Sequence, residues 1–303
     1  MKKVISILTA VLLFSLLSGC TPRQQPAQIA ATTLPVYEFT SRLCEGTGLT
    51  VTQLVNESVS CLHDYSLSVD QVRRTEAAEL VVISGAGLEE FMEDLLQDKQ
   101  VIDSSAGIPL IEGGHEHSHD HDHEDEAHEE ESHEGHHHEQ DPHIWLSPVN
   151  AKLMAQNICS GLTARYPGQA ATIEKNLQNL LADLDALETY GREQLAEVNC
   201  RELITFHDGF AYLADCYGLT ILEAVEEESG SEASASELIH LIEEVEHHQL
   251  PAIFTEALGS VSAARIISAE TGVAVYTLDM GMHGNSWFEA MYHNISTLKG
   301  ALG

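Results

Sequence analysis

Short apolar runs alternate along the chain with stretches of helical periodicity, which predicts an α/β protein. The run Leu80–Gly87 (LVVISGAG) is apolar and ends in glycines, as buried parallel strands do. The stretch that starts at Ser68 has helical character, with Ser68 as its expected N-cap. Regular alternation of this kind is typical of parallel sheets whose strands are connected by helices.

The same pattern recurs on both sides of a helical middle region. We therefore predict two similar α/β halves that flank one long helix. The predicted strands lie within 28–33, 49–55, 80–87, 100–105, 202–206, 219–225, 251–257 and 273–279. The predicted helices lie within 35–46, 68–79, 87–97, 148–165, 168–198, 209–217, 234–248, 260–271 and 288–302.

The middle region, residues 148–198, is almost wholly helical in pattern and is interrupted only near Tyr166-Pro167-Gly168. We expect one helix over 168–198, about 45 Å long, which is longer than one domain core requires. A helix of this length can tie two lobes together. Its apolar positions recur every three or four residues, at Ile173, Leu177, Leu180, Leu184 and Leu187.

The first twenty residues have the features of a bacterial lipoprotein signal peptide. Lys2 and Lys3 precede an apolar run, Val4–Leu17, that is short for a membrane span. Leu17-Ser18-Gly19-Cys20 resembles a lipobox, in which cleavage leaves Cys20 as a lipid-modified N-terminus. We therefore expect a protein of the cell envelope, anchored through Cys20 on the extracytoplasmic face of the membrane.

These patterns divide the chain into five parts. They are a signal peptide (1–20), a tether (21–28), an N-terminal α/β lobe (29–147) with an inserted loop (113–140), a helical segment (148–198) and a C-terminal α/β lobe (199–303).

The composition is strongly acidic, with a formal net charge of −34. This charge argues against nucleic-acid binding and favours solubility and the attraction of cations. Between His115 and Glu139 the chain has ten histidines, eleven acidic residues and no Lys or Arg. A tract with no apolar residue larger than Ala127 cannot form a core, so we expect a solvated loop.

The histidines of this tract are candidate auxiliary metal ligands that collect metal weakly and at several sites. A merely solvating loop is the alternative. The histidines are His115, His117, His119, His121, His123, His128, His133, His136, His137 and His138.

Five cysteines remain besides Cys20, and none has the C-x-x-C spacing of a metal site. Because five is an odd number, at least one must stay unpaired. Cys44 with Cys61 is our candidate disulfide, and Cys159 with Cys200 is a weaker candidate. Isolated buried thiols are the alternative.

Four short segments carry residues that are suited to bind a transition metal. They are CLHDYSLS with His63, DPHIWLSP with His143, ITFHDGFAYLADCYGL with His207, and VYTLDMGMHG with Asp279. Three imidazoles and a carboxylate suit tetrahedral Zn²⁺. Each segment belongs to a different βα unit, so the fold can bring them into the crevice at the carboxyl ends of the strands.

In this order, the four segments resemble the metal-binding solute receptors of bacterial ABC importers for zinc and manganese. The resemblance covers residues 29–303. It implies two α/β lobes joined by one long rigid helix, with the metal site in the cleft between the lobes. It also implies a monomeric, non-enzymatic receptor that captures Zn²⁺ and delivers it to an ABC permease.

Carried over by position, the ligands are His63, His143, His207 and Asp279. Manganese-type members commonly have glutamate at the third position. An imidazole from His207 favours zinc over Mn²⁺ because harder oxygen ligands suit manganese. His283 or a water molecule is an alternative to Asp279 as the fourth ligand.

Other polar residues receive supporting or neutral roles. Asp64, Asp208 and Glu256 are candidates to orient the ligand imidazoles. The segment Ser60-Cys61-Leu62 departs from the family pattern, which has proline directly before the first ligand. The remaining histidines, His240, His247, His248 and His293, lie in predicted helices, where we expect the first three on a solvated face.

Four other functions are consistent with parts of this pattern. A zinc enzyme is disfavoured because the sequence has no HExxH, nucleophile elbow or paired-carboxylate motif. A manganese receptor of the same family is the nearest alternative. A surface adhesin or a zinc-storage lipoprotein is also consistent with the lipid anchor.

Overall fold

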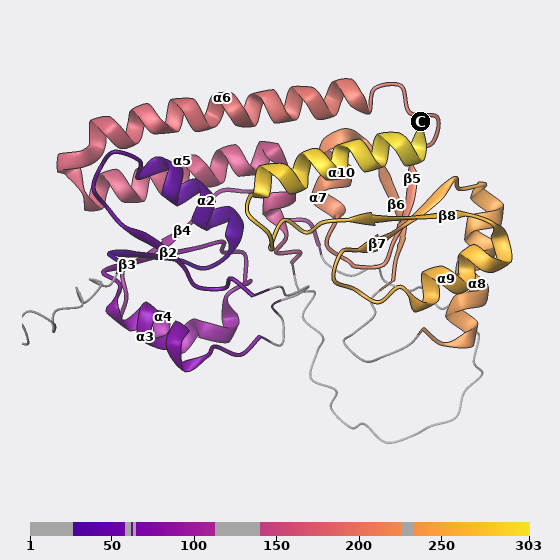
Figure 1. The fold of residues 1–303 in the computed structure, drawn as a ribbon, viewed down its shortest axis with the longest axis horizontal. Coiled ribbons are helices and arrows are strands. Elements are labelled where there is room, and N and C mark those ends of the chain that lie inside the picture. Colours follow the sequence, from indigo (N-terminus) through magenta and orange to yellow (C-terminus); the bar gives the residue numbers. More distant parts are fainter. Residues whose placement is uncertain (1–26, 58–61, 63–64, 113–139, 226–232) are drawn as a thin grey trace, which may run out of the picture.

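The computed structural model describes residues 27–57, 62, 65–112, 140–225 and 233–303, which form two α/β halves beneath long helices (Figure 1). The first half contains β1 (Ile29–Ala31), α2 (Leu34–Leu43), β2 (Val51–Gln53), α3 (Val69–Ala77), β3 (Leu80–Ile83), η1 (Glu90–Met92), α4 (Glu93–Leu96) and β4 (Val101–Asp103). The middle region contains η2 (Ile144–Leu146), α5 (Pro148–Arg165), η3 (Pro167–Gln169) and α6 (Ala170–Gln194). The second half contains β5 (Glu202–Thr205), α7 (Ala211–Tyr217), β6 (Thr220–Ala224), α8 (Ala235–His248), β7 (Ala252–Glu256), α9 (Ser262–Thr271), β8 (Ala274–Leu278) and α10 (Trp287–Leu302).

Each half is built on a four-stranded parallel sheet, as the sequence predicts. The strand orders are β2-β1-β3-β4 and β6-β5-β7-β8. In the first sheet the chain passes from β1 to β2 on one side and then to β3 on the other side of β1, so a switch point lies between β1 and β3. The second sheet has the equivalent switch point between β5 and β7. Crevices at the carboxyl ends of such strands are where open α/β sheets bind ligands.

Local sequence signals set where several helices begin. Ser68 caps α3 as predicted, because its Oγ accepts a hydrogen bond from Gln71 N (3.4 Å) while Gln71 Oε1 accepts from Ser68 N (2.7 Å). Ser234 and Glu237 form the same capping box at the start of α8. Each box satisfies two backbone donors that a helix start leaves unpaired.

The long helix α6 runs along both halves and packs against α5, α2 and α10 (Figure 1). With 25 residues, it is about 37 Å long. Its buried face is made by Ile173, Leu180, Leu184 and Leu187, all fully buried. These side chains belong to one apolar cluster that extends from Ile29 in β1 to Leu302 in α10. The two halves therefore share a core.

Two predicted helices differ clearly from the structure. The long helix spans 170–194 rather than 168–198, because Arg201 Nη2 bonds the carbonyl oxygens of Leu195 (3.0 Å) and Ala196 (2.9 Å) and ends it there. The predicted helix 87–97 is reduced to η1 and α4. The carboxylate of Glu89 instead accepts hydrogen bonds from the N–H groups of Ser84 (2.7 Å) and Gly85 (2.9 Å).

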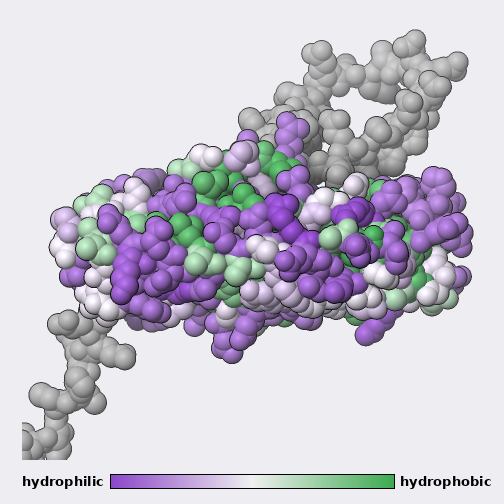
Figure 2. All heavy atoms as spheres, turned by 90° about the horizontal axis from the view of Figure 1, so that it is seen from above, coloured by the Kyte–Doolittle hydropathy of each residue, from purple (hydrophilic) through white to green (hydrophobic). Residues whose placement is uncertain are grey.

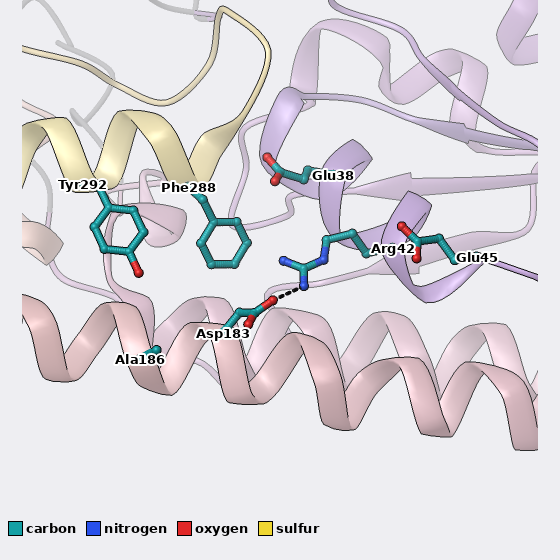
Figure 3. A pocket seen from close by; sticks show the side chains of 7 residues that line it. All are labelled: Glu38, Arg42, Glu45, Asp183, Ala186, Phe288 and Tyr292. Carbon is teal, nitrogen blue, oxygen red and sulfur yellow. Dashed lines mark hydrogen bonds and ion pairs between the residues drawn. The ribbon is translucent and has the colours of Figure 1, made fainter.

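Three helices from different parts of the chain meet around a hollow of about 450 Å³ (Figure 3). Arg42 of α2 forms an ion pair with Asp183 of α6, and its guanidinium lies 5.1 Å from the ring centroid of Phe288 in α10. In the same place, Glu38 Oε2 accepts from Trp287 N (2.6 Å). Burial raises the pKa of Glu38, although the hydrogen bonds from Trp287 and Ser286 oppose this. The contacts hold α10 of the second half against α2 of the first.

The face seen from above is covered mostly by polar residues, with apolar residues in separate patches (Figure 2). This fits the strongly acidic composition. Among the described helices, none combines the length and apolar character that crossing a bilayer needs.

The shared core predicts a large penalty for truncating α6. Leu184→Ala removes a fully buried side chain, so the unfolding free energy should fall by about 2–5 kcal/mol. Urea unfolding measures this loss, and the m-value should stay unchanged. Leu153→Ala in α5 is the matched control, because Leu153 is 36% exposed, and it should change stability by about 0.5 kcal/mol or less. Equal losses for the two variants would contradict a core that runs through α6.

Candidate metal centre

His143 is buried just before η2, with 3% of its surface exposed. Asp141 holds it from two sides, since Asp141 Oδ1 accepts from His143 N (2.8 Å) and lies 2.7 Å from His143 Nδ1. An ionised carboxylate only accepts, so the Nδ1 atom carries the proton and the lone pair of Nε2 is left for another partner. This is the arrangement that orients imidazole ligands in metal sites.

His207 stands at the switch point of the second sheet. It follows the carboxyl end of β5, and Glu256 is the last residue of the neighbouring strand β7. The distance from His207 Nδ1 to Glu256 Oε2 is 3.8 Å, and both side chains are largely buried. The prediction placed His207 and Glu256 in one site, and the sheet topology brings them side by side.

The imidazoles of His143 and His207 lie next to each other. His143 Nε2 and His207 Nε2 are 3.5 Å apart, and the two rings lie edge to face at 84°. Zn–N bonds of 2.0–2.1 Å at a tetrahedral angle separate two nitrogens by about 3.3–3.4 Å. The observed separation is therefore close to that of two ligands on one zinc ion.

Gly209 leaves room for this arrangement. A Cβ atom at this position would lie 2.8 Å from His207 Cδ2 and 2.6 Å from Met280 Cε. Both distances are shorter than van der Waals contact allows, so any larger residue would displace the imidazole or Met280.

Asp279 and His283 lie in the loop after β8. Asp279 Oδ1 accepts from Gly281 N (2.7 Å), and Asp279 Oδ2 is 3.6 Å from His283 Nε2. Asn294 of α10 fixes the backbone of Asp279 by accepting from its N–H (2.8 Å) and donating to its carbonyl (2.7 Å). Within the described residues, however, the only three-residue group with ligand atoms mutually within 4.8 Å lies on α8. Asp279 is therefore not clustered with the two imidazoles, and its role as fourth ligand stays a prediction, as does that of His283.

The charge of Asp279 affects the pKa of Glu256. Burial, and then repulsion by Asp279, raise the pKa of Glu256 to about 8. Two acidic groups therefore lie close together, largely buried, next to His207. A divalent cation would relieve this repulsion, because positive charge favours the ionised form of both groups.

The loop that carries Asp279 is tied to the segment that carries His143. Trp145 is fully buried, and its Nε1 donates to the carbonyl oxygen of Met280 (2.7 Å). The segments belong to parts of the chain 135 residues apart, so this bond fixes the two sides of the centre relative to each other.

Both flanks of the predicted His-rich loop are fixed beside His143. Asp141 N donates to Ile111 O (3.0 Å), and Glu112 and Gln140 form an antiparallel bridge. Tyr212 of α7 joins both flanks, because its hydroxyl donates to Asp141 O (2.9 Å) and accepts from Ile111 N (3.0 Å). The chain on the two sides of the tract is therefore joined at one point, three residues before His143.

Several predicted site residues lie outside the described residues. They are Cys20, Cys61, His63, Asp64 and the ten histidines of residues 115–138. Their roles stay predictions.

No disulfide joins two of the described cysteines, which are Cys44, Cys159, Cys200 and Cys216. The weaker candidate pairing, Cys159 with Cys200, is therefore wrong, and burial raises the pKa of the Cys159 thiol. The pairing of Cys44 with Cys61 stays a prediction, because Cys61 is outside the described part of the chain.

Three supporting residues were not predicted: Asp141, Trp145 and Tyr212. Asp141 has a local signal, because an acid two residues before a histidine can bond both its N–H and its ring. Trp145 and Tyr212 have no such signal, since each contacts a segment more than 70 residues away.

Solved structures share this fold. A crystal structure of ZnuA matches with a TM-score of 0.74 and 27% identity, over 91% of this chain and all of that chain. The Zn(II)-bound ZnuA-like domain of AdcA from Streptococcus pneumoniae matches with a TM-score of 0.73 and 27% identity, over 90% and 98% of the two chains.

The sequence itself matches the family described as zinc-uptake complex component A, periplasmic, over residues 29–301, and the chain belongs to that family. It is 32% identical to the zinc-binding lipoprotein AdcA of Streptococcus pneumoniae over 99% of this chain and 61% of that protein. It is 30% identical to the high-affinity zinc uptake protein ZnuA of Bacillus subtilis over 90% and 87%. The chain thus spans about three-fifths of the length of AdcA. The family consists of solute-binding proteins of transport systems, not enzymes.

The raised pKa of Glu256 predicts a pH dependence of the metal-free protein. Between about pH 4.5 and 8 the folded state keeps a proton that the unfolded state has released, so stability falls as pH rises. This group lowers the unfolding free energy by up to about 1.4 kcal/mol per pH unit in that window. Glu256→Gln is neutral at every pH and should flatten the fall. Urea unfolding at pH 5, 6.5 and 8 measures it.

Glu243→Gln is the control for that experiment, because Glu243 is exposed on α8. It should keep the pH dependence of the parent protein. An unchanged slope in Glu256→Gln would show that Glu256 is already ionised across this range.

Proposed function

We propose that this chain is an extracytoplasmic receptor that captures Zn²⁺ between its two halves and delivers it to an ABC permease. The observation that carries the proposal is the 3.5 Å separation of His143 Nε2 and His207 Nε2, which come from segments 64 residues apart. Membership of the zinc-uptake family supports it. The names of two relatives, a zinc-binding lipoprotein and a high-affinity zinc uptake protein, agree with it.

The proposed ligands are His63, His143, His207 and Asp279. Asp141 and Glu256 act on the ligand imidazoles, the first by direct hydrogen bonding at 2.7 Å and the second as a buried carboxylate 3.8 Å from His207 Nδ1. If the Asp279 carboxylate keeps its contacts within its own loop, His283 or a water molecule is the fourth ligand instead. A site of this kind binds metal by displacing protons from its ligands, so capture weakens at low pH.

Zinc is the proposed cargo, rather than Mn²⁺. The two imidazoles that meet are both nitrogen donors, which suit zinc, whereas carboxylates and water suit manganese. The centre needs no catalytic residue, because capture and release change no covalent bond.

The tract of residues 115–138 is proposed as an auxiliary collector. Its flanks are fixed beside His143 by Tyr212, so metal held there is near the central site. The lipid on Cys20 is proposed to hold a monomeric receptor at the membrane, where the permease lies.

Removal of a central imidazole should abolish tight binding. His143→Ala takes away a buried nitrogen donor and leaves Asp141 without its partner, so zinc affinity should fall by at least about 100-fold, more than the loss of an outer partner causes. His293→Ala is the matched control, since His293 is exposed on α10, and it should bind zinc as the parent does. Titration calorimetry with Zn²⁺ and Mn²⁺ measures both. Equal affinities for parent and His143→Ala would refute the central site.

Removal of the tract should spare the tight site. A variant that lacks residues 115–139 keeps the Glu112–Gln140 bridge, so it should still bind one zinc ion tightly while losing weak equivalents. Calorimetric stoichiometry is the measurement. Loss of the tight site in this variant would move the function from His143 into the tract.

A further inference from the structure

A second group of metal-ligand side chains lies on α8, outside the centre described above. Glu244, His247 and His248 have ligand atoms that are all within 4.8 Å of one another. Their spacing of three and four residues places them on one face of the helix. The imidazoles of His247 and His248 lie edge to face, with ring centroids 4.8 Å apart. Two imidazoles and a carboxylate form a donor set suited to zinc.

His248 differs from a freely solvated surface histidine. It follows the buried positions Leu241 and Val245 by seven and three residues, so it lies at the edge of the face that packs on the sheet. Its side chain is only 25% exposed. The prediction that His248 lies on a solvated face is therefore wrong, whereas His247 is exposed as expected.

Two carboxylates face the two nitrogens of His248. The Nδ1 atom is 2.9 Å from Glu202 Oε2, and the Nε2 atom is 3.4 Å from Glu244 Oε2. A neutral imidazole has one N–H and can satisfy only one of them. If Glu202 takes that hydrogen bond, the lone pair of Nε2 faces an anionic oxygen, which repels it unless a cation lies between them.

A zinc ion between Nε2 and Glu244 resolves this conflict. Zn–N and Zn–O bonds of about 2.0–2.2 Å at a tetrahedral angle hold nitrogen and oxygen about 3.3–3.5 Å apart, and the observed distance is 3.4 Å. Glu202 then orients His248 from outside, as Asp141 orients His143. The last turn of α8 is also the negative end of the helix dipole, which favours a cation.

The two places are well separated. Glu202 begins β5 and His207 follows its end, so they lie about 16 Å apart along the strand. Helix α8 lies at the outer end of the second half, beside α9 (Figure 1). Metal on α8 therefore cannot share ligands with His143 and His207.

We propose that Glu244, His247 and His248 form a second, peripheral Zn²⁺ site, with Glu202 as its orienting residue. Three protein ligands leave at least one position open to water. His247 is exposed and its neighbours are partly so. The site therefore binds more weakly than the central one and fills only after it.

Residue-resolved modification tests the proposal on the full chain. Diethyl pyrocarbonate acylates unprotonated imidazole nitrogens, and mass spectrometry locates the products while a chelator buffer fixes the free zinc concentration at pH 7. Rising zinc should protect His247 and His248. His240 is the internal control, because it also faces one carboxylate (Glu223, 3.2 Å) but belongs to no such cluster, and its modification should not change.

Matched variants distinguish the loss of a metal ligand from the loss of a nearby negative charge. Glu244→Gln should abolish protection or raise the half-protecting zinc concentration by more than about tenfold, and Glu202→Gln should raise it by about tenfold. Glu243→Gln removes the same charge one residue away and should behave as the parent. His143→Ala should leave the protection intact, so failure of the central site does not affect the result.

Two outcomes overturn the proposal. If zinc leaves the modification of His247 and His248 unchanged, the cluster binds no zinc and Glu202 and Glu244 only contact His248. If zinc protects them equally in Glu244→Gln and in the parent, the ligand set is wrong.

Discussion

The close approach of two imidazoles from segments 64 residues apart is the constraint on which the rest of the structure depends. His143 Nε2 and His207 Nε2 are 3.5 Å apart, and metal–ligand bonds tolerate only about 0.2 Å of error. The two sheets must therefore keep a fixed offset. A shared apolar cluster, the length of α6 and the bond from Trp287 to Glu38 join the two halves, and the bond from Trp145 to Met280 ties η2 to the second half. A pair of imidazoles held in this way is oriented by the structure around it.

The same region collects acidic groups whose ionisation a bound cation would favour. Asp141 is buried against His143, and Glu256 is buried next to His207 with Asp279 near it. The raised pKa of Glu256 reports the cost of ionising that carboxyl group without a counter-charge. A bound divalent ion lowers this cost and is attracted in turn, so metal affinity and proton affinity are coupled at one place.

The sequence predicts most of the architecture, because its signals are local. Apolar runs that end in glycine, and the serine cap at Ser68, place strands and helices correctly. The end of the long helix lies beside Arg201, which bonds the carbonyl oxygens of Leu195 and Ala196 only five or six residues earlier, but the apolar pattern does not indicate this contact. The candidate site follows the same rule: βα ends indicate His207 and Glu256, but nothing near Trp145 indicates its partner Met280. The contact of His248 with Glu202, 46 residues away, has no local signal either.

The central pair of imidazoles and the α8 cluster offer the same kinds of ligand, but the central pair is largely buried and the α8 cluster is partly exposed. In each, a carboxylate fixes Nδ1 of one imidazole and leaves Nε2 to face another ligand. An overall charge of −34 attracts every cation, including Ca²⁺ and Mg²⁺, which prefer oxygen ligands. Only places where nitrogen lone pairs are held in position favour zinc among them. At the central pair, burial adds rigidity and a low dielectric, so we expect tighter zinc binding there than on α8. On α8 water would compete for the ion, so we expect faster exchange. On the proposed function, the charge of the chain concentrates metal and the oriented imidazoles select it.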